Sequence, residues 1–199
     1  DPVRFIGNYS SGKMGFALAE ACAERGAEVT LVAGPVSLKT HHPAIKRIDV
    51  ESAGEMYQAA MTAFPSSDAA ILCAAVADYR PENASEQKIK RETEREMTLH
   101  LVPNPDIAAS LGAIKREGQV MVGFALETND EATHAEGKLK RKNLDFIVLN
   151  SLRDQGAGFR CDTNKITIID NAGGVTSYPL KTKREVACDI VNKLVTLLK

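Results

Sequence analysis

The residues best placed to do chemistry near the start of the chain are Ser10-Ser11-Gly12, a short segment that leads into a helical pattern. Apolar residues recur at helical spacing from Met14 onward, so we expect a helix over residues 13–25 capped by Ser10 or Ser11. The first turn of a helix presents free backbone N–H groups, and the helix dipole favours an anion there. The segment therefore either binds a phosphate or simply caps the helix.

Two clusters of basic residues are the next candidates for chemistry. Lys88-Ile89-Lys90-Arg91 lies in a charged stretch, and Lys138 and Lys142 share one face of a charged helix expected over residues 131–142. Positive charge beside one crevice would suit a polyphosphate, because it neutralises the charge of the leaving group. Each cluster is also compatible with an ordinary solvated surface, so the residues alone leave this choice open.

Two acidic residues adjoin the ends of predicted elements. Asp78 follows an apolar run over residues 69–75, and Asp106 follows Pro105 at the start of a helix expected over residues 107–115. Asp106 is a good N-cap whatever else it does. Asp78 is either a site residue or a turn residue.

Buried apolar runs alternate with amphipathic patterns along most of the chain. We expect strands over residues 27–33, 45–50, 69–75, 120–125 and 145–149, and helices over residues 13–25, 52–64, 107–115, 131–142 and 183–198. Residues 165–170 and 175–180 have the pattern of a β-hairpin. The alternation predicts one α/β domain over residues 1–199, built on a doubly wound, mostly parallel, Rossmann-like sheet.

Residues 78–104 do not fit this alternation. They contain a charged loop and then a run over residues 97–102 that alternates apolar and polar side chains, as a half-exposed strand does. We interpret the segment as an inserted antiparallel arm. An exposed strand edge needs a partner, so we predict that the chain forms a homodimer through this strand.

The predicted sheet brings the candidate residues to one edge. Ligands of open parallel sheets bind at the carboxyl ends of the strands, which here carry Gly34, Ala74 to Asp78, Phe124 to Glu127, and Asn150. A dinucleotide site is disfavoured because the loop reads G-x-x-G and the next strand ends without an acidic residue for a ribose. The Walker A pattern for a triphosphate is absent as well.

Composition narrows the class of protein. The formal net charge is −1 over 199 residues, which gives no general electrostatic argument for binding nucleic acid. No apolar run approaches the roughly 20 residues of a membrane span. The four cysteines have no paired spacing, so we expect reduced thiols and a cytoplasmic protein. The histidines form no metal-binding pattern, and the sequence assigns no metal ligand.

Several motifs, taken in order, resemble the phosphopantothenoylcysteine synthetase family, in its bacterial CTP-dependent form. The resemblance is collinear from Asp1 to about Asn150 and weaker beyond. Its motifs are Asp1-Pro2-Val3-Arg4, Asn8 to Gly15, Ala74 to Arg80, Lys88-Ile89-Lys90-Arg91, Asn104-Pro105-Asp106-Ile107, Gly123-Phe124-Ala125 with Glu127-Thr128, and Lys142-Asn143-Leu144-Asp145. Arg91 stands where the family more often has lysine in its mobile lid motif.

The resemblance implies a ligase of coenzyme A biosynthesis. The carboxylate of 4′-phosphopantothenate would attack the α-phosphate of CTP, with Mg²⁺ present, to give an acyl-cytidylate and pyrophosphate. The amine of L-cysteine would then displace CMP and form the amide. In many bacteria the family's domain follows a flavin-dependent decarboxylase, so FMN is expected only if such a domain is fused upstream. The resemblance also implies a further strand that would precede Asp1.

The resemblance also assigns roles to residues. Lys88 would stabilise charge on the α-phosphate, and Asn8 would hold the acyl-cytidylate. The Ser10-Ser11-Gly12 turn would hold a phosphate, and Lys138 and Lys142 would contact the triphosphate. The cytidine would lie among Cys73, Ala74, Ala75, Asp78, Pro105, Asp106, Ile107, Ala108 and Phe124.

Two other functions remain open at this point. A nucleotide-binding Rossmann-like oxidoreductase would bind NAD(P)H and have no need of cysteine. A non-catalytic nucleotide-binding module would keep its function when Lys88 is replaced by glutamine.

Overall fold

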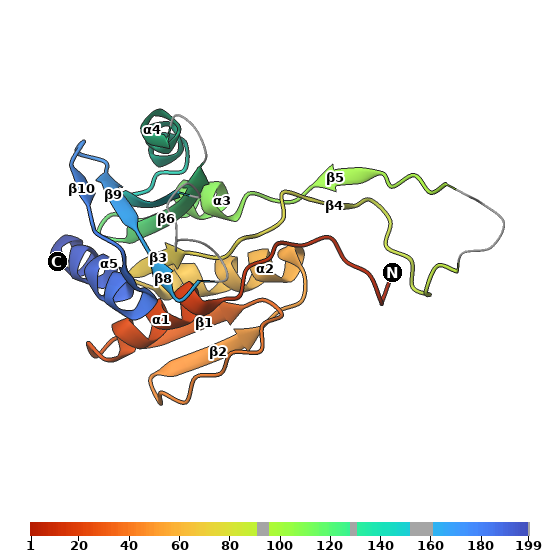
Figure 1. Cartoon of the computed structure of the whole chain (residues 1–199), viewed down its shortest axis with the longest axis horizontal. Helices are drawn as coiled ribbons and strands as arrows, with labels where there is room; N and C mark the ends of the chain where they lie inside the picture. The colour runs from red at the N-terminus through yellow and green to blue at the C-terminus, as the bar shows by residue number, and fades with distance from the viewer. Residues whose placement is uncertain (91–95, 128–130, 152–160, 199) are drawn as a thin grey trace.

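The protein is a three-layer α/β domain with a long projecting arm (Figure 1). The computed structural model describes residues 1–90, 96–127, 131–151 and 161–198. The central sheet has the spatial order β10-β9-β7-β6-β3; its strands are β3 (Ala69–Leu72), β6 (Val120–Glu127), β7 (Phe146–Ser151), β9 (Ile166–Asp170) and β10 (Val175–Ser177).

Three neighbouring strands of this sheet are parallel. β3 pairs with β6 in the register Leu72↔Gly123, and β6 pairs with β7 in the register Val122↔Phe146. β9 is antiparallel to β7, and β10 is antiparallel to β9. The apolar sequences of β6 and β7, whose described side chains are mostly buried, fit strands covered on both faces. The predicted mostly parallel sheet is therefore confirmed, and the predicted hairpin is β9–β10.

The helices cover both faces of the sheet. α1 (Lys13–Ala23) and α5 (Lys183–Leu197) pack together on one face. The other face is covered by α2 (Ala53–Ala63), α3 (Ile107–Ile114) and α4 (Glu131–Arg141). The short 3-10 helix η1 (Phe64–Ser66) follows α2. Two parallel strands, β1 (Val29–Ala33) and β2 (Ile45–Asp49), pair in a separate small sheet beside α1.

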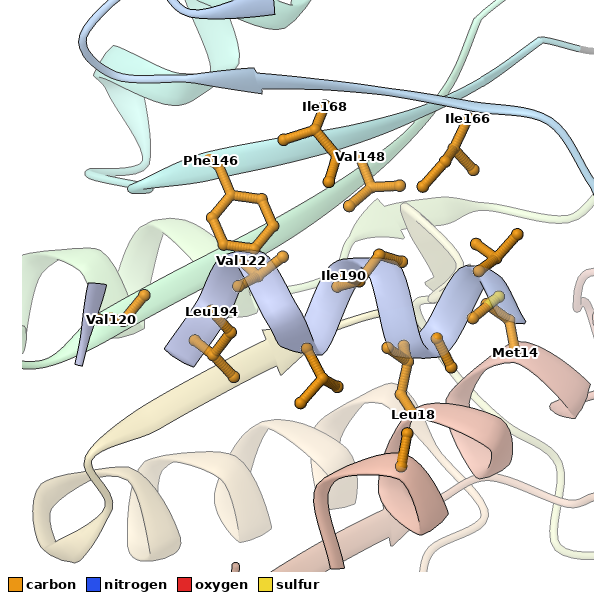
Figure 2. Close-up of a cluster of buried hydrophobic side chains, with 14 residues drawn as sticks. Met14, Leu18, Val120, Val122, Phe146, Val148, Ile166, Ile168, Ile190 and Leu194 are labelled. Atoms are coloured by element: carbon orange, nitrogen blue, oxygen red, sulfur yellow. The ribbon is translucent and has the colours of Figure 1, made fainter. Parts of the chain in front are cut away.

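Two hydrophobic cores separate these layers. Figure 2 shows the core between the α1–α5 pair and the sheet, where Ile190 and Leu194 of α5 face strands β6, β7 and β9. Its buried members include Met14, Leu18, Val120, Val122, Phe146, Val148, Ile166 and Ile168. The second core lies under α3 and α4 and includes Leu111, Met121, Leu139, Leu144, Ile147 and Ile169. These cores fix the strand ends that carry the candidate site.

The arm projects away from the layered body. It begins with β4 (Tyr79–Pro81) and returns through β5 (Leu101–Pro103), which pair antiparallel in the register Arg80↔Val102. Figure 1 shows the N-terminus beside the far part of the arm and the C-terminus at the opposite end of the molecule. The predicted antiparallel arm is present, but its strand is shorter than the predicted span over residues 97–102, because β4 offers only three pairing residues.

The helix caps correct one prediction and refine another. The N-cap of α1 is Gly12, at φ 77°, and no side chain caps it, so the expected cap by Ser10 or Ser11 is wrong. Ser52 caps α2, with Oγ accepting from Glu55 N–H at 3.1 Å, so the helix expected over residues 52–64 begins after Ser52. The Glu55 carboxylate reaches back to the Glu51 N–H at 2.9 Å.

The C-terminal region contains one small sheet that the sequence did not predict. β8 (Thr163–Asn164) and β11 (Lys181–Thr182) pair antiparallel just before α5. Thr182 then starts α5 with a full capping box that includes Glu185. This brings the first residue of α5 to the same edge of the molecule as the start of α1.

Candidate functional site

The start of α1 is a turn built from backbone groups. Gly12 adopts a left-handed conformation, and a Cβ added there would lie 3.2 Å from Val36 Cγ1. The positive φ and this close approach both favour glycine. Phe16 N–H donates to Gly12 O at 3.0 Å, which closes the first helical bond. Ser10 and Ser11 lie half-buried just before the turn. The turn therefore presents the positive end of the α1 dipole at the strand-end edge.

Asn8 connects this N-terminal segment to the end of β3. Its Nδ2 donates to Ala75 O at 2.8 Å, although the two residues are 67 positions apart. Ala75 belongs to the run after β3, which also contains Cys73, Ala74 and Asp78. The structure thus brings the predicted residues Asn8 and Ala75 into direct contact.

Asn104 connects the same run to the start of α3. Its Nδ2 donates to Ala77 O at 2.8 Å, and its backbone N–H donates to Asp78 O at 2.8 Å. The Arg80 guanidinium donates to Pro103 O at 2.6 Å. These contacts hold the Asp78 segment beside Pro105 and Asp106. The sequence motif included Asn104, but no role had been assigned to it.

Asp106 and Lys142 form an ion pair at the start of α3. Lys142 Nζ lies 3.0 Å from Asp106 Oδ2, and Asp106 Oδ1 accepts from Ala109 N–H at 3.0 Å, so the predicted N-cap is confirmed. Partial burial raises the pKa of Asp106, but the Ala109 N–H and the Lys142 ammonium outweigh this effect and hold it below its ordinary value. Ile107 is buried under the turn, and Ala108 is half-buried.

A tight junction fixes the position of Lys142. Asn143 takes a positive φ of 51°, and its Nδ2 donates to Gly112 O at 3.0 Å. A Cβ on Gly112 would lie 2.2 Å from Lys142 O, so the backbones of α3 and the segment after α4 touch. Asp145 completes the junction by accepting from Met121 N–H and Lys115 Nζ, each at 2.6 Å.

A second lysine group lies where α1 and α5 begin. Lys13 Nζ lies 2.6 Å from Asp162 Oδ1, and Lys183 Nζ donates to Cys161 O. Burial lowers the pKa of Lys183, and the neighbouring Lys13 ammonium lowers it further. Burial raises the pKa of Cys73 to about 12, so this thiol stays protonated and is unsuited to nucleophilic attack.

The carboxyl ends of β6 and β7 complete the edge. Gly123 pairs with Leu72, the last residue of β3, so Phe124 lies beside the start of the run that follows β3, although β6 itself continues to Glu127. Asn150 lies near the end of β7, and its Oδ1 is buried without a hydrogen-bond partner among the described residues. Asn150 was expected at this edge of the sheet as a polar residue at the end of a buried strand, but no role had been assigned to it.

The predicted basic residues do not all meet. Lys138 is half-buried on α4, near Lys142, whereas Lys88 is exposed on the segment after β4. Figure 1 shows that this segment lies at the far part of the arm, away from α4. The structure therefore groups the β3, α3 and α4 residues at the sheet edge and holds Lys88 apart from them.

The described parts of the chain contain no metal cluster and no membrane-spanning helix. Among those residues, no group of three or more His, Cys, Asp or Glu could hold a metal ion. No helix in the same ranges is long and apolar enough to cross a bilayer. Cys22, Cys73, Cys161 and Cys188 are all free thiols.

Fold and site define an α/β domain of Rossmann-like type whose candidate site lies at the strand ends and the start of α1. Residues 1–198 match the DNA/pantothenate metabolism flavoprotein C-terminal domain, and the chain belongs to that family. The predicted family is thereby confirmed.

Curated relatives agree with the family and differ in name. The chain is 48% identical over 199 residues to the coenzyme A biosynthesis bifunctional protein CoaBC of Vibrio parahaemolyticus, covering 100% of this chain and 49% of that protein. It is 59% identical over 198 residues to a protein of an unknown prokaryotic organism named cysteine/cysteine sulfinic acid decarboxylase, covering 100% and 55%. The chain thus spans about half the length of these relatives.

Solved structures share the fold over nearly the whole chain. The crystal structure of the C-terminal domain of CoaBC has a TM-score of 0.82 at 38% identity and covers 99% of this chain and 88% of that one. Cab2 mutant H337A, in complex with phosphopantothenate-cysteine, has a TM-score of 0.73 at 16% identity and covers 98% and 81%. The second likeness concerns the fold alone.

Proposed function

We propose that this chain is the phosphopantothenate–cysteine ligase of coenzyme A biosynthesis, in its CTP-dependent form. The observation that carries the proposal is the match to the C-terminal domain of CoaBC, at 38% identity over 99% of this chain and 88% of that domain. The relative named as a decarboxylase is nearly twice as long as this chain, so its name does not place decarboxylation in the half matched here. The names of the CoaBC relatives favour a ligase over an oxidoreductase or a non-catalytic module.

The reaction proposed has two steps. In the first, a carboxylate oxygen of 4′-phosphopantothenate attacks the α-phosphorus of CTP, the bond to the β-phosphate oxygen breaks, and pyrophosphate leaves. In the second, the amine nitrogen of L-cysteine attacks the acyl carbon, the bond to the CMP oxygen breaks, and the amine releases a proton to water. Neither step requires a covalent bond to the protein, which agrees with the raised pKa of Cys73.

Positive groups of the sheet edge would bind the nucleotide. The backbone of the Ser10-Ser11-Gly12 turn would bind a phosphate, and Lys138 and Lys142 would contact the triphosphate. Cytidine would lie between the run after β3, the start of α3, and Phe124; Asn104 holds the first two together. Because Asn8 already contacts Ala75, it is placed to hold the acyl-cytidylate beside that run.

Lys88 would act in the activation step. Its ammonium would offset the charge that develops on the α-phosphate as pyrophosphate leaves. Since the described arm holds Lys88 away from α4, this role requires either movement of the segment or supply from a second copy of the chain.

Mg²⁺ and FMN have different places in this proposal. Mg²⁺ keeps several waters and is bound through substrate phosphates with one or two carboxylates, so it would arrive with CTP. Bound there, it would offset charge on the triphosphate. Asp78, which is exposed after β3, would supply one such carboxylate. FMN would belong only to a decarboxylase domain fused upstream.

The homodimer proposal rests on where apolar side chains are exposed. Large exposed hydrophobic residues gather on the N-terminal segment and the arm: Val3, Phe5, Ile6, Tyr9, Tyr79, Ile89, Met97, Leu99 and Leu101. Large exposed apolar patches mark interaction sites, and these residues are concentrated on two neighbouring segments. A second copy of the chain would cover it. The free thiols and the metabolic relatives further favour the cytoplasm.

Replacing Lys88 by glutamine tests the proposed mechanism. With CTP, Mg²⁺ and 4′-phosphopantothenate, we expect K88Q to lower pyrophosphate release at least about a hundredfold, because a charge-stabilising group is removed. The melting temperature should stay unchanged, since Lys88 is exposed. Lys46→Gln, on the exposed side of β2, is the matched control. Full release by K88Q would remove Lys88 from the mechanism.

A further inference from the structure

The carboxylate of Asp1 is enclosed, although it lies in an otherwise exposed segment. Its side chain is 1% exposed, while the neighbouring Phe5 is 88% exposed. A carboxylate removed from water at such a position must be compensated by hydrogen bonds or by a charge partner. The hydrogen bonds and the ion pair of the Asp1 carboxylate therefore identify the segments that it connects.

One carboxylate oxygen shapes the N-terminal turn. Oδ1 accepts from the backbone N–H groups of Val3 and Arg4, each at 3.0 Å. Pro2 presets the backbone at the second position of this turn. The turn places the Arg4 guanidinium back over the carboxylate, with Nη2 3.1 Å from Oδ2.

The second carboxylate oxygen of Asp1 and the Arg4 guanidinium both bind the backbone of Ile89. Asp1 Oδ2 accepts from Ile89 N–H at 3.2 Å, and Arg4 Nη2 donates to Ile89 O at 2.6 Å. Both backbone polar groups of Ile89 are therefore held by side chains that lie 85 to 88 positions earlier in the chain. The Asp1 carboxylate and the Arg4 guanidinium thus bind the Ile89 N–H and C=O as the backbone of a neighbouring β-strand would.

Ile89 directly follows Lys88. Fixing both backbone groups of Ile89 fixes the direction in which the chain leaves Lys88, so the contact sets where that side chain begins. The same N-terminal segment carries Asn8, which is bound to Ala75 at the end of β3. One short segment therefore ties the Lys88 loop to the strand-end edge.

We propose that Asp1 is a positioning residue: together with Arg4 it holds the backbone of Ile89 and so fixes Lys88 on the arm, in the place from which Lys88 would reach the nucleotide of a second copy of the chain in the activation step. This inference rests on the proposed function. Asp1 itself touches no reacting atom. Misplacing a catalytic group by about 1 Å costs up to about a hundredfold in rate, so losing these contacts with Ile89 should lower turnover without weakening nucleotide binding.

The Asp1→Asn variant removes the contacts by which Asp1 holds Ile89 and keeps the hydrogen bonds of the N-terminal turn. The single amide oxygen of asparagine can still accept from Val3 and Arg4 N–H, but the amide NH₂ cannot accept from Ile89 or pair with Arg4. Asp49→Asn is the matched control, because Asp49 pairs with Arg47 at 2.6 Å at the end of β2, remote from the arm. Neither aspartate belongs to the hydrophobic cores, so both variants should fold.

Three readouts test the proposal on the 199-residue chain. In D1N, the Ile89 amide hydrogen should exchange at least about tenfold faster than in wild type, because a buried acceptor has been lost. The kcat for pyrophosphate release should fall about tenfold or more with KM for CTP unchanged. In a K88Q background, D1N should add no further loss, because Asp1 acts through Lys88. D49N should match wild type throughout.

The outcomes separate the two proposals. Active wild-type protein with unchanged Ile89 exchange or unchanged kcat in D1N would overturn the positioning role alone. An equal loss from D1N in the wild-type and K88Q backgrounds would also overturn it, since Asp1 would then act elsewhere. Absence of pyrophosphate release by wild-type protein would overturn the proposed function and the positioning role with it.

Discussion

The body and the arm of this molecule are held by different forces. In the body, Met121, Val122, Phe146 and Val148 have no exposed surface, and their strands are packed from both faces. In the arm and the N-terminal segment, Phe5 and Tyr9 are 88% and 79% exposed. Order there comes from contacts between side chains and distant backbone, such as those of Arg80 and Asn104.

The difference separates two tasks within one chain. Burial of apolar surface makes the sheet edge rigid, so the strand ends, Asp106 and Lys142 are positioned by packing. The arm has few buried contacts and depends on individual polar ones, which is typical of segments that open or move at low cost. Lys88 lies on this second kind of structure, so its placement is set by contacts that single substitutions can remove.

Two phenylalanines give the largest expected contrast. Phe146→Ala removes a fully buried ring and should lower the free energy of unfolding by about 3–5 kcal/mol. Phe5→Ala removes an exposed ring and should change it by less than about 0.5 kcal/mol in the monomer. Denaturant titration at low protein concentration measures both. Equal losses would contradict the division between body and arm.

Gly112 tests whether the body positions a site residue. A Cβ there would meet Lys142 O at 2.2 Å, so Gly112→Ala must separate α3 from the segment that carries Lys142. We expect a loss of about 1–3 kcal/mol in stability, together with a raised KM for CTP. Gly137→Ala is the control, since a Cβ at that position meets nothing within 4 Å. A neutral G112A would show that this junction tolerates displacement.

Leu101 tests the surface of the arm. It is 43% exposed on β5, where a second copy of the chain is proposed to bind. Leu101→Glu should weaken self-association at least about tenfold, because a charge would be buried in an apolar interface, and leave the monomer folded. Sedimentation across a concentration series measures this change. A wild-type chain that is monomeric at all working concentrations would refute the homodimer.

Lowering the pH should reduce the stability of the body through Asp170. This is the smallest effect among the four predictions. A hydrogen bond from Lys193 and the Gly174 N–H lower the pKa of Asp170 below its ordinary value of 3.8. The unfolded chain therefore takes up the proton first as the pH falls. The stabilisation is fully present above about pH 4 and is lost as the pH falls through the lowered pKa. Asp170→Asn should flatten this acid dependence, and an unchanged profile would exclude Asp170 as its source.

Local sequence pattern predicted the body well. Apolar runs rich in Val and Ile became β6 and β7, and Asp106 capped α3, because burial and capping depend on neighbouring residues. The cap of α1 was mispredicted because Gly12 adopts a left-handed backbone and takes the N-cap position itself. Glycine can adopt the left-handed conformation, but its presence in a sequence does not show that it does so.

The arm and the site were predicted less completely. The alternation over residues 97–102 marked a strand, but pairing extends only over Leu101–Pro103 because β4 is equally short. The contacts of Asn8, Asn104 and Asp1 join residues 27 to 88 positions apart. No local periodicity encodes such pairs. The family resemblance supplied the proposed roles of residues, and the structure shows the contacts that these residues make.

The most direct test of the central claim follows both steps with purified protein, Mg²⁺ and 4′-phosphopantothenate, comparing CTP with ATP in the presence and absence of L-cysteine. The account predicts pyrophosphate release with CTP, and CMP together with the cysteine amide only when L-cysteine is present. Preference for ATP would contradict the CTP-dependent assignment. Failure to form the amide with either nucleotide, also in a chain extended at its N-terminus by the strand that the family resemblance implies, would contradict the ligase itself.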